Sequence, residues 1–408
     1  MPPPHAVRMT TIIRAGAAHD LLALVPALAG FRPTRSIVCI AFRGTRSVGV
    51  LRHDLPRRAR DRAALVTSIV GTLCRMPGVD GVVPIVYTDR TFAAERGLPE
   101  RTLLGLVVRR AEQAGFLVRD ALCRAADAWG SLLDPDTPSS GHPLARIEQS
   151  EAAALAPDGA GDAPAVTPEL PERDPAAAAA IAEELAALAD PTRVEACLER
   201  LGPEADPVEL VEVLLDDAAG EPAAHPAHRL AWFAHLATSP PMRDAMMLQF
   251  AFGADVGRLA LDDAELTATR AARYGETVDD LVEREFDRGT ESDVSRTLGN
   301  LLLGQVTTRP DVRRVERAFG VLRRLIADAP ADRRTGLLCI AAWLAWSLGR
   351  GSAAGALIDR GVEAEPTHSM ARLLSAFIGS GALPEWAFVP AEEDADPEMG
   401  PAGPVSDR

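Results

Sequence analysis

Short apolar runs near the start of the chain have the spacing of β-strands. The runs 37–42 and 48–51 flank a polar stretch that contains Gly44, and this pattern predicts a β-hairpin. A strand is also predicted over 10–14 and a helix over 17–29, which a glycine and a proline terminate. The hairpin is therefore expected in a sheet that carries at least one helix.

Helical and strand-like patterns alternate after the hairpin. Apolar residues recur with helical spacing over 58–76 and 99–114, and the continuous run Gly81–Tyr87 between them is typical of a mostly buried strand. Because Pro84 cannot donate a backbone hydrogen bond, we expect this strand at a sheet edge or at a bulge. Two more strands are predicted over 116–124 and 128–133. Residues 1–133 thus predict an α/β domain, with a mixed sheet, a hairpin and flanking helices.

The periodicity changes beyond residue 133. Residues 134–174 are rich in proline, glycine, alanine and acidic residues, and without an apolar period they predict a flexible linker. Helical patterns separated by helix-start and helix-stop residues fill 175–390 and predict an all-helical domain. A disordered tail is expected over 391–408.

One part of the helical region has features of a tetratricopeptide unit. Pro366 falls where such a unit ends, and the small residues Ala342, Ala354 and Gly361 fall where its helices would approach closely. A single degenerate unit is equally compatible with a general helical bundle. The sequence therefore predicts an all-α C-terminal region that is partly tetratricopeptide-like.

Composition excludes several kinds of chemistry. All 43 basic residues are arginine, so a lysine-dependent phosphate loop and a Schiff-base enzyme are both excluded. The five cysteines are scattered singly, which predicts reduced thiols, and His225, His228 and His235 lack the supporting ligands of a metal site. No apolar run approaches the ~18 residues of a membrane span. We expect a cytoplasmic protein without a cofactor, a metal or a membrane association.

The charge is distributed unevenly along the chain. Residues 1–133 hold 19 arginines and 10 acidic residues, whereas residues 148–222 hold 3 arginines and 19 acidic residues. The N-terminal region is therefore basic although the net charge of the whole chain is −15. Such a region favours anionic ligands or partners.

Several short motifs together resemble a known family. They are Val25-Pro26, Gly30-Phe31-Arg32-Pro33, Ser36-Ile37-Val38, Arg52-His53-Asp54-Leu55-Pro56, Val86-Tyr87-Thr88, Gly115-Phe116, Trp129, Arg243-Asp244 and the stretch from Ala341-Ala342-Trp343 through Pro366. The combination is similar to that of bacterial domain-of-unknown-function family 4192, an uncharacterised family of high-GC Gram-positive bacteria. The resemblance implies an architecture and no chemistry. Members often carry cysteines after the tryptophan-bearing strand, whereas residues 133–141 contain none here.

Polar side chains follow two of the predicted strands. The candidate ligand-binding residues are Arg52, His53 and Asp54 after the hairpin, and Thr88, Asp89 and Arg90 after the buried run. Ligands of open α/β sheets bind beyond the carboxyl ends of strands, so the two groups would converge on one cleft if their strands were neighbours. The competing interpretation is that the two aspartates only cap turns.

The densest basic cluster lies at the start of a predicted helix. Its members, Arg57, Arg58, Arg60 and Arg62, are candidate anion-binding residues because guanidinium groups bind phosphates. Only two tyrosines are present and no nucleic-acid recognition motif accompanies the cluster, so nucleic-acid association is the weakest interpretation.

The leading functional prediction is a non-enzymatic protein-binding protein with an assembly or regulatory role. Helical arrays commonly present extended surfaces to other proteins, and the sequence contains no catalytic constellation. The alternative is an enzyme or sensor for a small polar or anionic ligand, bound at the cleft near Arg52–Asp54 and Asp89.

Overall fold

The computed structural model describes residues 16–29, 33–56, 58–154, 168–216 and 225–389. The chain divides into two compact units, Met1–Pro164 and Ala165–Arg408. The strand predicted over 10–14, the side chain of Arg57 and the tail predicted over 391–408 lie outside the described residues.

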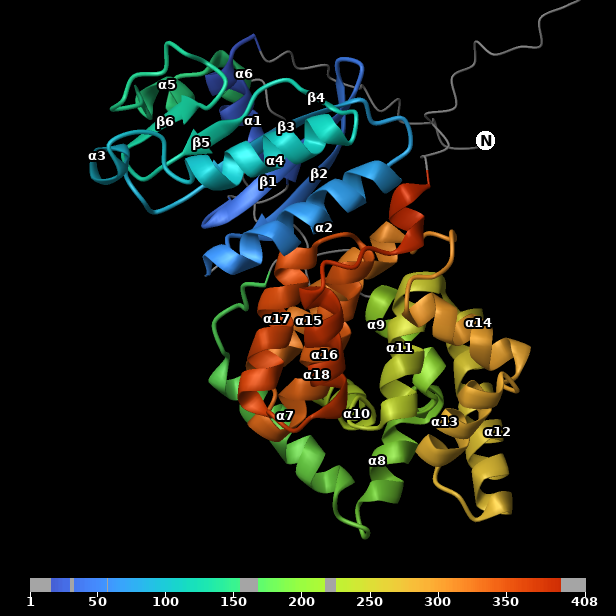
Figure 1. Cartoon of the computed structure of the whole chain (residues 1–408). Coiled ribbons are helices and arrows are strands. Elements are labelled where there is room, and N and C mark those ends of the chain that lie inside the picture. The colour runs from blue at the N-terminus through green and yellow to red at the C-terminus, as the bar shows by residue number, and fades with distance from the viewer. Residues whose placement is uncertain (1–15, 30–32, 57, 155–167, 217–224, 390–408) are drawn as a thin grey trace, which may run out of the picture. The chain divides into compact units, whose positions relative to one another are not determined.

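The first unit is built on a seven-stranded mixed sheet (Figure 1). The strand order is β2-β1-β3-β5-β6-β7, and β4 pairs with β3 beside this path. The strands are β1 (Ser36–Arg43), β2 (Arg46–Asp54), β3 (Gly81–Tyr87), β4 (Leu117–Val118), β5 (Leu122–Arg124), β6 (Ala128–Ser131) and β7 (His142–Pro143). β3 is parallel to β4 and β5, whereas the other pairs are antiparallel. The predicted mixed sheet with its hairpin is thus confirmed.

Helices cover both faces of this sheet. They are α1 (Ala18–Ala29), α2 (Arg62–Arg75), α3 (Phe92–Glu95), α4 (Arg101–Gln113), α5 (Ala145–Glu148) and α6 (Glu151–Ala154), with a 3₁₀ turn η1 (Ala59–Asp61) before α2. Leu22 and Val25 of α1 pack on Val38 and Ile85, and α5 and α6 lie against α1. α2 and α4 pack together on the opposite face (Figure 1). The sheet therefore has an α1 face and an α2/α4 face.

Pro84 lies in a central strand, so the edge position predicted for β3 is wrong. The amide of Thr88 donates to Arg124, and the carbonyl of Val82 accepts from the amide of Arg119. Backbone groups of every second residue of a strand point to the same side, so the nitrogen of Pro84 also faces the β4–β5 side. There the parallel partner is interrupted between Val118 and Leu122, and no ladder bond requires the missing N–H.

Residues 134–154 contribute to the first unit, although their sequence shows no apolar period. His142 of β7 lies opposite Trp129 of β6, with ring centroids 4.7 Å apart, and the indole N–H of Trp129 donates to the carbonyl of Pro143 at 3.2 Å. Leu144 and Ile147 then pack on the core beneath α1. Contacts of a few side chains order this segment, and such contacts leave no periodic pattern in the sequence.

The described residues of the second unit form helices and the loops that connect them. Its elements are α7 (Pro175–Leu188), α8 (Val194–Leu201), η2 (Gly202–Ala205), α9 (Pro207–Asp216), α10 (Ala227–Leu236), α11 (Pro240–Phe252), α12 (Ala254–Tyr274), α13 (Val278–Arg288), α14 (Asp293–Leu302), α15 (Val312–Asp328), α16 (Ala331–Ser347), α17 (Gly351–Ala364), α18 (Ser369–Gly379) and η4 (Glu385–Phe388). The predicted all-α region is confirmed. None of the helices in the described ranges is long and apolar enough to cross a membrane.

α16 forms the centre of this unit. It packs against α10, α11, α15, α17 and α18, and every residue from Thr335 to Ser347 is buried. Ala342 and Ala354 are fully buried, and a Cβ added at Gly361 would lie 3.7 Å from the Cβ of Leu338. Small residues thus permit the close approach of α16 and α17 that the sequence predicts. The tetratricopeptide-like character of these helices remains a prediction.

Candidate functional site

The residues that end β2 do not share one face of the sheet. Asp54 pairs with Ser36 and Arg52 with Val38, on the α1 face, whereas His53 between them points to the α2/α4 face. The Nη2 of Arg52 lies 2.7 Å from the Oδ1 of Asp54. Burial lowers the pKa of His53, and the adjacent positive charge of Arg52 lowers it further. The imidazole of His53 is thus separated from the Arg52–Asp54 pair by the sheet.

The residues that follow β3 have separate environments. The hydroxyl of buried Thr88 accepts a hydrogen bond from the amide of Arg90 at 3.2 Å, which is a local turn. Asp89 lies 3.7 Å from the guanidinium of Arg35, with side chains 78% and 75% exposed. β1 separates β2 from β3 in the sheet. The predicted single cleft required β2 and β3 to be neighbours, and they are not.

The arginine cluster before α2 also divides. Arg58 and Arg60 are exposed, and the nearest carboxylate oxygen to the Nε of Arg60 is that of Asp61 at 3.7 Å. Arg62 is 26% exposed and turns toward Glu100, with 3.2 Å between its Nη2 and the Oε2 of that residue. Only Arg62 of the described cluster residues reaches the pocket that Arg90 lines.

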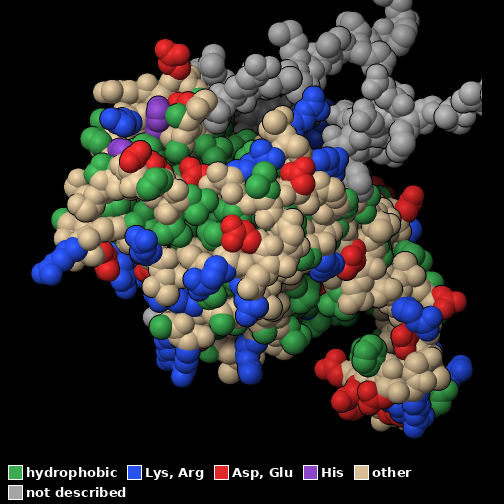
Figure 2. Space-filling model, turned by 45° about the horizontal axis from the view of Figure 1, so that its top comes forward, with side chains coloured by type: hydrophobic (Ala, Val, Ile, Leu, Met, Phe, Trp, Pro, Cys, Tyr) green, Lys and Arg blue, Asp and Glu red, His purple; other side chains and the backbone are tan. Residues whose placement is uncertain are grey.

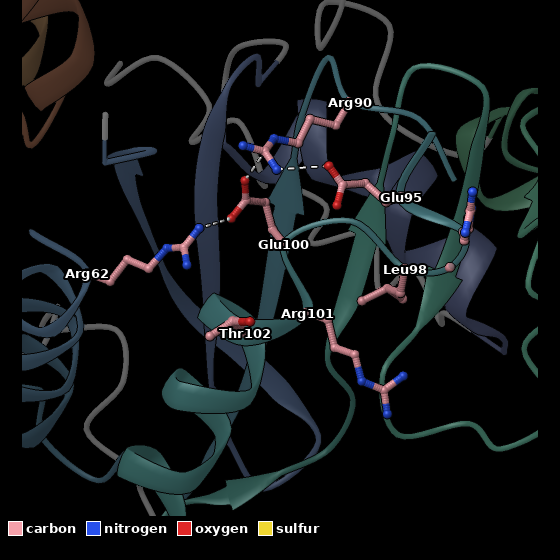
Figure 3. Close-up of a pocket in the computed structure, with 9 residues that line it drawn as sticks. Arg62, Arg90, Glu95, Leu98, Glu100, Arg101 and Thr102 are labelled. Carbon is pink, nitrogen blue, oxygen red and sulfur yellow. Dashed lines mark hydrogen bonds and ion pairs between the residues drawn. The ribbon is translucent and has the colours of Figure 1, made fainter. Parts of the chain in front are cut away.

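That pocket lies beyond the carboxyl end of β3, on the α2/α4 side (Figure 3). Its volume is about 280 Å³, and we call it the arginine pocket. Its lining residues are Arg62, Arg90, Glu95, Arg96, Gly97, Leu98, Glu100, Arg101 and Thr102. Four guanidinium groups and two carboxylates leave a formal charge of +2, with a single apolar side chain, that of Leu98. The arginine pocket is therefore a strongly polar, cationic site.

Glu100 organises the charges of the arginine pocket. Its side chain is 9% exposed, and its two oxygens lie 3.2 Å from Arg62 and 3.4 Å from Arg90 (Figure 3). Arg90 also donates to Glu95 at 2.9 Å. Because Glu100 lies between the two guanidinium groups, it holds both in fixed positions. A ligand that binds them therefore loses little free energy in ordering these side chains. The pocket is thus arranged before any ligand enters.

Unusual backbone angles bring these side chains together. Arg96 and Glu100 have φ values of 52° and 53°, and Gly97 has a φ of 153°. Non-glycine residues rarely adopt a positive φ, and where they do, the strain is commonly found at functional sites. α4 begins directly after Glu100, and no side chain caps its first amides. These amides add partial positive charge to the pocket.

Sequence reasoning found Arg62 and Arg90 but missed Glu95, Arg96, Glu100 and Arg101. The signal for them is weak, because two glutamates near arginines are common in loops. Arg62 and Glu100 are 38 residues apart in sequence, and their contact depends on how α2 and α4 pack. The arginine pocket thus contains Arg90 from the predicted ligand-binding group and Arg62 from the predicted anion-binding cluster.

The histidines near residue 230 form no shared site. His228 and His235 lie on α10, and His235 stacks on Trp232 with ring centroids 5.3 Å apart. Across the described ranges, no three His, Cys, Asp or Glu side chains are grouped so that they could hold a metal ion.

A family model described as a domain of unknown function, DUF4192, matches residues 19–273 and 304–385. The chain belongs to this family. No curated protein and no solved structure matches the chain. The DUF4192 match includes the whole arginine pocket, whereas residues 274–303, which hold α13 and α14, lie outside it. The pocket is therefore part of the family region, and the α13–α14 segment is not.

Proposed function

We propose that this DUF4192 protein binds a small phosphate-bearing anion in the arginine pocket, as a sensor or binding protein and not as an enzyme. The observation that carries the proposal is the set of four guanidinium groups around one cavity at the carboxyl end of β3. Arginine forks match the oxygens of phosphate, and ligands of α/β sheets bind at this edge. The alternative predicted from the sequence is a small polar or anionic ligand at a cleft near Arg52–Asp54 and Asp89. The proposal keeps that class of ligand but assigns it to the arginine pocket, which none of those residues lines.

The contacts of the pocket support binding without catalysis. The carboxylates of Glu95 and Glu100 are paired with arginines, so neither is placed as a free general base. The Nε of Arg62 is buried and lacks a hydrogen-bond partner among the described residues, which leaves a donor for a ligand. A polar lining with one apolar side chain suits a compact polyanion better than a ligand with an aromatic base.

Replacement of Arg90 tests this proposal. We expect Arg90→Gln to weaken pyrophosphate binding about tenfold, because one charge-assisted contact is lost. Isothermal titration of the full chain measures the change. Arg110→Gln on α4 is the matched control, since it removes an equal charge outside the pocket lining. Absence of pyrophosphate binding by the wild type, or equal weakening by both variants, would contradict the proposal.

A second candidate function is protein binding through α13, in line with the leading prediction from the sequence. Val278, Val282 and Phe286 are spaced by four residues on α13 and are 41%, 50% and 74% exposed. Residues at this spacing form one stripe on a helix, and an apolar stripe left in solvent favours a protein partner. The stripe lies in the segment that the family model does not match, which favours a partner specific to this chain.

Removal of the Phe286 side chain tests this second function. We expect Phe286→Ser to change the free energy of unfolding by less than about 0.5 kcal/mol, because the residue is exposed. The same variant should lose partners that the wild type retains in affinity purification from the native cell. Leu373→Ser is the matched control, since Leu373 is 66% exposed on α18. Identical sets of partners for wild type and Phe286→Ser would exclude α13 as the docking surface.

Nucleic-acid binding has the least support. On the face shown in Figure 2, arginine side chains are interspersed with acidic and hydrophobic ones and form no continuous basic surface. Electrostatic recognition of a polynucleotide requires such a surface.

A further inference from the structure

One row of side chains crosses the sheet of the first unit where β2, β3 and β5 end. Cross-strand pairing places its members next to one another in the order Asp54, Ser36, Tyr87, Arg124, Trp129 and His142. Paired residues of a sheet share a face, and Tyr87 and Trp129 pack in the core beneath α1. We call this set the edge row. It lies on the α1 face, whereas the arginine pocket lies on the α2/α4 side.

Two hydroxyl groups of the edge row are buried without a partner. Ser36 is 0% and Tyr87 is 4% exposed, and neither side-chain oxygen has a hydrogen-bond partner among the described residues. A buried polar group without a hydrogen bond destabilises a protein by about 1–3 kcal/mol, so such groups are rare. The two residues pair directly across β1 and β3. Two adjacent unsatisfied hydroxyls therefore point to a ligand that satisfies both.

The charges around these hydroxyls favour a singly charged anion. Arg124, an exposed residue, follows Tyr87 in the edge row and has no ion pair within the described ranges. Burial raises the pKa of Tyr87, and the positive charge of Arg124, its neighbour across β3 and β5, opposes this rise. On the other side of Ser36, Asp54 is already paired with Arg52 at 2.7 Å. One uncompensated guanidinium therefore remains beside two neutral donors.

We propose that Ser36, Tyr87 and Arg124 bind a small monocarboxylate with a short apolar tail. The two hydroxyls donate to the carboxylate oxygens and Arg124 supplies the opposite charge. A short apolar tail suits the surroundings of the hydroxyls, because Tyr87 belongs to the same apolar cluster as Leu22 and Val25 of α1. A phosphate dianion is a poorer match, because a single guanidinium compensates only one of its two charges next to the buried hydroxyls.

An exposed ion pair lies at this end of the two strands. It joins Arg35, before Ser36, to Asp89, after Tyr87, and both side chains are at least three-quarters exposed. Exposed ion pairs contribute little stability, so this pair adds little to the rigidity of the strand ends. The inference is independent of the proposed phosphate site, because no residue of the edge row lines the arginine pocket.

The chain contains only two tyrosines, which allows a direct test by ¹⁹F NMR of 3-fluorotyrosine-labelled protein. We expect butyrate to produce a saturable shift of the Tyr87 signal, whereas Tyr274, 63% exposed on α12, serves as the internal control and stays unmoved. Ser36→Ala and Arg124→Gln should each weaken the butyrate affinity about tenfold or more. Pyrophosphate should leave the Tyr87 signal unchanged. This last result would distinguish the carboxylate site from the arginine pocket.

A second variant removes the hydroxyl without disturbing the fold. We expect Tyr87→Phe to leave the thermal midpoint of the free protein unchanged or higher, since no hydrogen bond is lost, and to abolish stabilisation by butyrate. A lower midpoint for the free protein would show that the hydroxyl already has a partner. That result, a Tyr87 signal that butyrate does not move, or a shift that persists in Ser36→Ala, would overturn the proposal.

Discussion

Trp346→Ala is expected to lower the free energy of unfolding of the helical unit by about 3–5 kcal/mol. The Trp346 ring is 1% exposed and contacts the rings of Trp343, Phe377 and Trp386, with centroid distances of 5.0–6.2 Å. Its indole N–H donates to the carbonyl of Ala382 at 2.8 Å. Truncation therefore creates a large cavity and leaves that carbonyl without its partner.

Tryptophan fluorescence during urea unfolding measures this loss, because four of the five tryptophans lie in the helical unit. Trp346→Phe is the matched control. It retains an aromatic ring and should destabilise the unit clearly less than the alanine variant does. A change below about 1 kcal/mol for Trp346→Ala would show that η4 and α18 do not depend on this ring.

The sequence predicts most of the fold because local patterns determine it. The run Gly81–Tyr87 matches β3 residue for residue, since a continuous apolar segment between turn-forming residues has few alternatives. The position of Pro84 was not predictable, because it depends on where β4 and β5 interrupt their pairing with β3. The sequence of β3 alone does not show that its neighbouring strand is interrupted opposite Pro84.

Partly buried polar networks likewise could not be predicted from the sequence. Glu212 accepts hydrogen bonds from Arg314 and from the side chain of Gln249, which joins α9, α11 and α15. Burial alone would raise the pKa of Glu212, but these hydrogen bonds outweigh it and lower the pKa. Residues so distant in sequence meet only through helix packing.

The candidate site was predictable in part for the same reason. The rule that ligands bind beyond the carboxyl ends of strands directed attention to Arg90, and charge density directed it to Arg62; both line the arginine pocket. The carboxylate between them belongs to Glu100, whose position requires the left-handed backbone at Arg96 and Glu100. Neither residue is a glycine, so the sequence gives no warning of these angles.

Glu100→Gln is expected to strengthen pyrophosphate binding by about 10-fold to 100-fold. The change keeps the shape of the side chain but removes a negative charge that lies 3.2 Å from Arg62 and 3.4 Å from Arg90. At an effective dielectric constant of about 20, one such contact contributes up to about 4 kcal/mol, and solvent and salt reduce this value. Two guanidinium groups released from Glu100 become available to the ligand.

The sign of this effect distinguishes the possible roles of Glu100. Glu112→Gln on α4 is the matched control, since it removes an equal charge outside the pocket lining and should leave the affinity unchanged. Tighter binding by Glu100→Gln together with weaker binding by Arg90→Gln would show that Glu100 acts as an internal competitor of the anion. If both variants bind pyrophosphate more weakly, Glu100 acts by holding Arg62 and Arg90 in position for the anion, and its charge is not a competitor.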